Sequence, residues 1–68
     1  MSDDFRELAQ FELPYSRKAE LREVTFEGGM KMLRLILREG RRITQIDLDA
    51  DSASALSETM RDWADGQG

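Results

Sequence analysis

The sequence predicts an α+β fold: an antiparallel β-meander of three to four strands with one C-terminal helix packed on one face. Between residues 18 and 48, apolar residues recur mostly at every second position and are interrupted by glycines, the pattern of strands joined by hairpins. From residue 50 the apolar spacing changes to three and four, which is typical of an amphipathic helix. We expect one domain over residues 5–65, with frayed termini at residues 1–4 and 66–68.

The segment before residue 16 is the hardest to assign. Phe11, Leu13 and Tyr15 alternate with other residues, which indicates a short strand, and a proline at position 14 confines that strand to an edge or an end. Phe5 and Leu8 are three residues apart, a spacing that fits a helical turn. The sequence therefore leaves open whether residues 5–15 join the sheet.

Three further strands are expected over residues 18–26, 30–38 and 41–48. Gly28-Gly29 joins the first two, because glycine readily adopts the positive φ angles of a tight hairpin, and Glu39-Gly40 joins the last two. The period of two slips once in the first of these strands, near residues 22–23, which predicts a β-bulge there.

Two-residue loops at these turns define a predicted register. They pair Val24 with Leu33, and the bulge then realigns Leu21 with Leu35. In the second hairpin they pair Leu37 with residue 42. One face of the sheet then consists of Leu21, Val24, Leu33, Leu35, Leu37, Ile46 and Leu48. Such an apolar face requires a cover.

The predicted cover is a helix over residues 50–64, and Gly66 is the residue expected to stop it from continuing. Its apolar stripe comprises Ala53, Leu56, Met60, Trp63 and Ala64. Asp49 or Asp51 is placed to cap the free N–H groups at its start. Trp63 is expected in the core, because an aromatic residue at this spacing usually packs against the rest of the fold.

The aspartates at positions 47, 49 and 51, with Glu58 in the twelfth position, resemble the start of a calcium loop. The sixth position of such a loop requires glycine for a sharp turn, and it holds Ser52. Helix capping explains the same aspartates, so we predict no metal site.

Composition argues against most chemistry at neutral pH. The chain has no cysteine and no histidine, so disulfides and the common zinc sites cannot form, and the usual nucleophiles and bases are missing. We predict that the protein is not an enzyme and has no catalytic or cofactor-binding residues. The N-terminal segment begins with acids rather than a basic and apolar leader, so a cytoplasmic location is expected.

The opposite face of the predicted sheet mixes apolar and cationic residues. It comprises Met32, Arg34, Ile36, Arg38, Arg41 and Ile43. If the helix covers only the first face, this patch is exposed, and a chain of 68 residues buries a marginal core. We therefore predict a homodimer, with this patch as the candidate interface or ligand face. The plainer alternative is an ordinary exposed surface on which arginine stems lie over the isoleucines.

Charge is unevenly distributed along the chain. The net charge is −4, yet residues 17–45 hold eight cations and four acids. A weak single-stranded nucleic-acid binder that uses Arg34, Arg38, Arg41 and Arg42 is the alternative function. Few aromatic residues accompany these arginines, and the acidic ends would repel a polyanion, so we expect an interaction or regulatory module of unidentified partner instead.

The stretch LPYSRKAELREVTFEGGMKMLRLILREGRRITQIDLD, followed by a helix ending in DWA, resembles a family of short bacterial proteins of unknown function. That resemblance implies no catalytic residue. It is based on Pro14-Tyr15, Arg17, residues 21–24, Gly29-Met30, Leu33-Arg34, residues 38–42, residues 47–49 and Trp63-Ala64. The architecture is also similar to the transcriptional-coactivator class of single-stranded-DNA-binding domains, which dimerise. This chain is shorter, acidic overall and poor in aromatic residues on its basic face.

Overall fold

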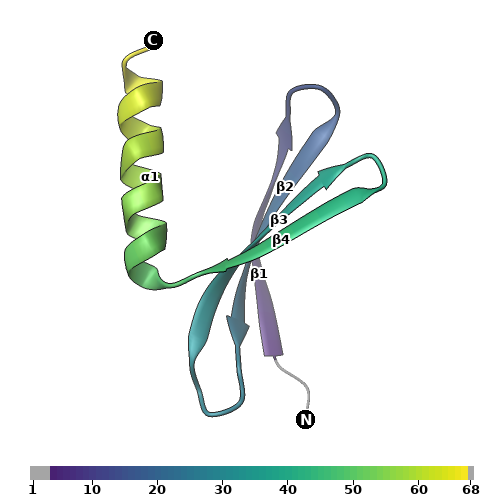
Figure 1. Ribbon diagram of the computed structural model, residues 1–68, viewed down its shortest axis with the longest axis vertical. Helices are drawn as coiled ribbons and strands as arrows, with labels where there is room; N and C mark the ends of the chain where they lie inside the picture. Colours follow the sequence, from purple (N-terminus) through teal and green to yellow (C-terminus); the bar gives the residue numbers. More distant parts are fainter. Residues whose placement is uncertain (1–3, 68) are drawn as a thin grey trace.

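A computed structural model describes residues 4–67, which form four strands and one helix (Figure 1). These elements are β1 (Asp4–Leu13), β2 (Arg17–Thr25), β3 (Lys31–Glu39), β4 (Arg42–Leu48) and α1 (Ala50–Asp65). The strands make one antiparallel sheet in the order β1-β2-β3-β4, and α1 packs against β3 and β4. The predicted α+β meander with a C-terminal helix is confirmed. Of the predicted frayed ends, residues 1–3 and 68 lie outside the described residues, whereas Asp4 begins β1.

The N-terminal segment joins the sheet as its edge strand. β1 pairs with β2 along its whole length, so the alternative of a helical turn at Phe5 and Leu8 is wrong. The register shifts between Glu7 and Ala9, which places a bulge at Leu8. The bulge was expected in the neighbouring strand. Because of this bulge, the odd-numbered residues before Leu8 and the even-numbered residues after it lie on the same face of the sheet.

The first hairpin has a loop of three residues rather than two. Phe26 donates its N–H to the carbonyl of Met30 at 2.8 Å, and both Gly28 and Gly29 have positive φ angles. The longer loop shifts the register by one, so β2 and β3 pair without a bulge and Val24 lies opposite Met32. The predicted pairing of Val24 with Leu33 and the predicted bulge in β2 are therefore wrong, and Val24 belongs to the opposite face.

The second hairpin turns at Gly40-Arg41, with Glu39 opposite Arg42. The first loop position has a φ of 60°, which glycine adopts without strain and glutamate does not. This explains why the turn is displaced from Glu39-Gly40, and why the predicted pairing of Leu37 with Arg42 is wrong. A displacement of two in register conserves the alternation of side chains, so β4 presents the predicted residues to each face.

The sheet has two distinct faces, assigned from this register. The apolar face carries Phe11, Leu13, Ala19, Leu21, Leu33, Leu35, Leu37, Ile46 and Leu48, with Arg17, Glu23, Lys31 and Arg42 toward its two ends. The charged face carries Phe5, Lys18, Glu20, Arg22, Val24, Met32, Arg34, Ile36, Arg38, Ile43 and Asp47.

The helix begins at a well-formed cap. Asp49 accepts a hydrogen bond from the N–H of Ser52 at 2.8 Å, and this contact lowers the pKa of the Asp49 carboxyl. Helical backbone from Ala50 onward replaces the loop that a calcium site would need, so the capping interpretation of this aspartate is confirmed. No helix among the described residues is long and apolar enough to span a membrane.

The hydrophobic core is small. Among the described residues the buried apolar side chains are Ala19, Val24 and Ile36, and none of these comes from α1. Figure 1 shows why: the helix leaves the end of β4 and stands to one side of the sheet instead of lying across it. The helix therefore covers its own sheet much less than its apolar stripe predicts.

Candidate functional site

The predicted interface residues lie on the charged face, with one exception. Met32, Arg34, Ile36 and Arg38 alternate along β3, and Ile43 lies opposite Arg38 on β4. The exception, Arg41, occupies the turn between the two strands. The face that the sequence predicts therefore exists, with its turn arginine at one end.

Ile36 is not available as an exposed apolar contact, because it is only 3% exposed. Glu20 lies directly opposite it on β2 and is itself buried. The carboxylate of Glu20 accepts a hydrogen bond from Arg38 Nε at 2.9 Å and another from Arg22 Nη2 at 3.1 Å. These long side chains flank Ile36 on the same face, as the alternative of arginine stems over isoleucine describes.

This arrangement keeps the Glu20 carboxyl ionised. The hydrogen bond from Arg38 is the main cause that lowers its pKa; burial opposes this shift, and the charges of both arginines support it. A buried carboxylate is tolerated because two guanidinium groups satisfy it. The two arginines therefore neutralise the Glu20 carboxylate, which is not suited to general acid catalysis, and the trio keeps one positive charge.

A second ion pair ties β3 to β4 on the same face. Arg34 donates from Nε to Asp47 Oδ1 at 2.8 Å and from Nη2 to Oδ2 at 3.1 Å, a bidentate contact. It lowers the pKa of the Asp47 carboxyl. Arg22 also stacks over the ring of Phe5, with 4.8 Å between the guanidinium carbon and the ring centroid. Most arginines of the charged face therefore already contact partners within the chain.

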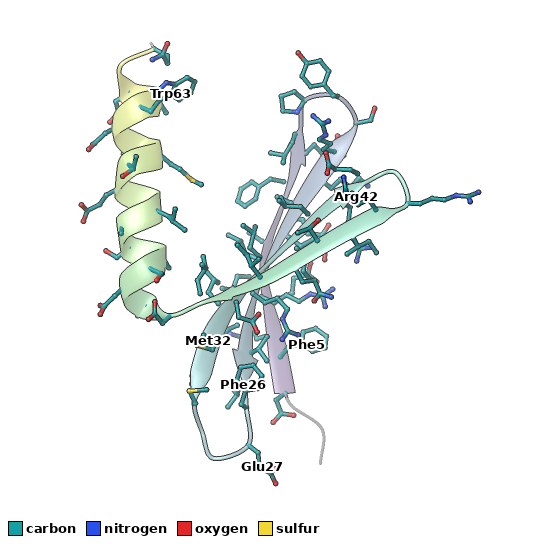
Figure 2. The ribbon with its side chains drawn as sticks, in the orientation of Figure 1. Phe5, Phe26, Glu27, Met32, Arg42 and Trp63 are labelled. Atoms are coloured by element: carbon teal, nitrogen blue, oxygen red, sulfur yellow. The ribbon has the colours of Figure 1, made fainter. Side chains whose placement is uncertain are left out.

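Cations without such partners gather at one end of the sheet. Pairing places the turn before Arg17 next to the turn at Gly40-Arg41, and Figure 2 shows Arg42 at this end. Among the described residues, Lys18, Lys31, Arg41 and Arg42 make no ion pair, and all of them except Lys31 lie at this turn end. One acid, Glu12, lies opposite Lys18 there.

An exposed aromatic ring lies at the same end. Tyr15 has a φ of 65°, a left-handed conformation that is costly for a bulky residue. The guanidinium of Arg17 lies over its ring, 5.7 Å from the centroid. The sequence pattern included Tyr15 in the alternation of a short strand, but β1 ends at Leu13 and Tyr15 lies in the following turn, at the same end of the sheet as the basic cluster.

The apolar face and the helix stripe form a second candidate surface, which sequence reasoning missed because it assigned them to each other. Phe11, Leu13 and Ile46 are exposed on the sheet. On the helix, Leu56 and Met60 are exposed and Trp63 is 69% exposed, so the prediction that Trp63 lies in the core is wrong for the single chain. Figure 2 shows Trp63 near the free end of α1, on the side of the helix that looks toward the strands.

Two hollows lie along this surface, one apolar and one with mixed apolar and charged walls. One is lined by helix residues alone: Leu56, Thr59, Met60, Trp63 and Ala64. The other lies where the helix begins and is lined by Leu8, Glu23, Lys31, Met32, Leu33, Leu48 and Ala50. The described strands therefore meet the helix near its start, but they do not line the hollow along its later turns.

The arrangement contains few elements of an active site. Among residues 4–67 no group of three or more acidic side chains is placed to hold a metal ion. The pKa values that shift clearly all belong to carboxyls held in their ionised form by neighbouring donors. Both candidate surfaces are therefore suited to binding, one through charge and one through apolar contact.

Comparison with known proteins identifies a family for this chain. The sequence model of a family described as Family of unknown function (DUF6967) matches residues 2–66. No curated protein and no solved structure gives a significant match to the chain. The family description assigns no activity, so the properties of the two surfaces are the basis for any functional assignment.

Proposed function

We propose that this chain, which belongs to the Family of unknown function (DUF6967), is a non-enzymatic, homodimeric interaction or regulatory module. The proposal is based on the geometry of its surfaces. We further propose that it is a bacterial protein of the cytoplasm. A chain without cysteine fits a reducing compartment, where disulfides do not contribute to stability.

The main support for the dimer is that the single chain exposes more surface than folded monomers of the same mass. Folded monomers expose about 6.3 M^0.73 Å², which is about 4,400 Å² for a mass of 7.8 kDa. The single chain exposes 5740 Å². The excess of about 1,300 Å² per chain is the size of one side of a large homodimer interface.

Small domains without disulfides or metals usually obtain the missing burial from a partner chain. A second copy is the partner that is present whenever the protein is made. Dimerisation would therefore supply burial that the single chain lacks, since only three apolar side chains are buried within residues 4–67.

Sedimentation velocity over a concentration series tests this proposal. We expect the mass of two chains from low micromolar concentration upward. A single folded chain at several hundred micromolar would overturn the homodimer.

A second candidate function, weak binding of single-stranded nucleic acid, is favoured by the turn end. There, Lys18, Arg41 and Arg42 lie beside the exposed ring of Tyr15, and such binding combines cations with an aromatic platform. Titration of a fluorescent oligonucleotide at low salt should show binding that weakens steeply with added salt. Absence of binding at low salt, or binding that survives the joint change Arg41→Glu and Arg42→Glu, would contradict it.

A further inference from the structure

The apolar face and the helix stripe share the features of an interface core. Both are rich in large side chains: Phe11, Ile46, Met60 and Trp63 are exposed, and the leucines at the centre of the sheet face are partly exposed. Aromatic residues and methionine are enriched at the centres of protein interfaces, and charged residues are depleted there. A surface of this kind on a small soluble chain marks a binding region.

Charges surround this surface and do not interrupt it. Helical periodicity places the acids of α1 on the side away from the stripe. On the sheet, Arg17 pairs with Glu39 at one end of the apolar face, and Arg6 pairs with Glu23 toward the other. The two cations of this face that make no ion pair, Lys31 and Arg42, lie at its opposite ends, so its apolar centre can be buried without enclosing them.

The charged face has the opposite character. Its apolar centre, Ile36, is already covered, and its arginines bind Glu20 and Asp47 of the same chain. A partner on this face would have to desolvate several ion pairs, which offsets much of what burial contributes. The large apolar side chains that stay exposed on this face are Ile43 and Phe5, which lie on the two edge strands, and the Phe5 ring is partly occupied by Arg22.

We infer that the apolar face and the helix stripe together form the homodimer interface, with the α1 stripe of each copy packed against the apolar face of the other. This inference rests on the proposed dimer and names its surface. It places the interface on the opposite side of the sheet from the candidate face that the sequence predicts.

Area and symmetry support a second copy as the occupant. Two excesses of about 1,300 Å² give about 2,600 Å² of buried surface, which lies within the range of obligate homodimers. A two-fold axis requires a self-complementary surface, in which each contact from one copy to the other is repeated in the reverse direction. A protruding helix stripe and an uncovered sheet face on the same chain satisfy this requirement.

Three substitutions that introduce glutamate test the surface by sedimentation and far-ultraviolet circular dichroism. Met60→Glu places a charge on the stripe, where the single chain leaves the side chain 63% exposed. Ala55→Glu places the same charge on the same helix outside the stripe, and Ile43→Glu places it on the charged face. Methionine, alanine and glutamate all favour helix, so helix propensity does not explain a difference between the two helix variants.

We expect Met60→Glu to raise the dissociation constant about a hundredfold or more, because the substitution enters the interface twice in a symmetric dimer. Ala55→Glu and Ile43→Glu should remain dimers. A dimer that tolerates Met60→Glu but dissociates with Ile43→Glu would overturn the interface and leave the proposed dimer intact. A monomeric native protein would instead overturn the proposed dimer itself.

Dissociation and unfolding can coincide in a small obligate dimer, so a measurement on the native protein is also needed. Trp63 is the single tryptophan of the chain and lies on the stripe. In the native dimer we expect its fluorescence to be shifted to the blue and protected from iodide. A Trp63 that iodide quenches as freely as an unfolded control, in a sample that sediments as a dimer, would overturn the inference.

Discussion

Three isoleucines give a matched test of which sheet face a second copy covers. Ile36 is 3% exposed, while Ile43 on the charged face and Ile46 on the apolar face are 52% and 47% exposed in the single chain. Replacement by alanine removes three carbon groups, each worth about 0.8 kcal/mol when buried. Complete burial of the lost groups therefore corresponds to about 2.4 kcal/mol, and half burial to about 1.2 kcal/mol.

Ile36→Ala should lower the free energy of unfolding by about 2–5 kcal/mol per chain, because the cavity adds to the lost transfer energy. If the protein were a single chain, Ile43→Ala and Ile46→Ala would each lower the free energy of unfolding by about 1.2 kcal/mol. If a second copy covers the apolar face, Ile46→Ala should cost about 2.4 kcal/mol per chain or more, while Ile43→Ala stays near about 1.2 kcal/mol.

The assay is urea unfolding followed by circular dichroism, with all variants at one chain concentration because the stability of a dimer depends on it. Both half-exposed isoleucines lie on β4, so differences in strand position are small. Equal costs at Ile43 and Ile46 would refute the assignment of the interface to the apolar face. A larger cost at Ile43 would place the interface on the charged face instead.

Two further predictions concern the charged face and the second turn. The pKa values of the Glu20 and Asp47 carboxyls lie below their ordinary values of 4.5 and 3.8, chiefly because Arg38 and Arg34 donate hydrogen bonds to them. Since the folded pKa is the lower one, this stabilisation is present above the ordinary value and is lost as the pH falls through the folded pKa. The urea midpoint should therefore drop below about pH 4.5, and Asp47→Asn should flatten the drop; an unchanged pH profile in this variant would count against the ion pair. Gly40→Ala should lower the free energy of unfolding by about 1–2 kcal/mol, because the backbone φ is 60° at this position. Gly66→Ala is the control and should lower it much less, because φ is −74° there. Equal urea midpoints for both variants would contradict the turn geometry.

Much of the fold could be predicted from periodicity and glycine. Alternation marked three strands, a change of spacing marked the helix, and glycines marked both hairpins. The register could not be predicted with the same accuracy, because it depends on loop length and on which residue adopts the positive φ. One extra residue in the loop at Gly28-Gly29 moved Val24 to the opposite face, whereas a shift of two at Gly40 left the faces of β4 unchanged.

The candidate surfaces were harder to predict because a hydrophobic pattern identifies which side of an element is apolar but not what covers it. Trp63 and Leu56 follow the spacing of core residues, yet both are exposed in the single chain. Ile36 follows the spacing of an exposed residue, yet the Glu20 ion pairs lie on its face and it is buried. Residue types alone do not distinguish these cases, because the distinction depends on three-dimensional neighbours.

Iodide quenching of Trp63 in the native protein, at a concentration where sedimentation gives the mass of two chains, tests most directly whether a second copy covers the helix stripe. Trp63 is 69% exposed in the single chain, so any strong protection must come from another molecule. We expect strong protection that is lost in Met60→Glu and retained in Ile43→Glu. A dimer in which Trp63 is quenched as freely as in the urea-unfolded protein would contradict the interface proposed for this fold.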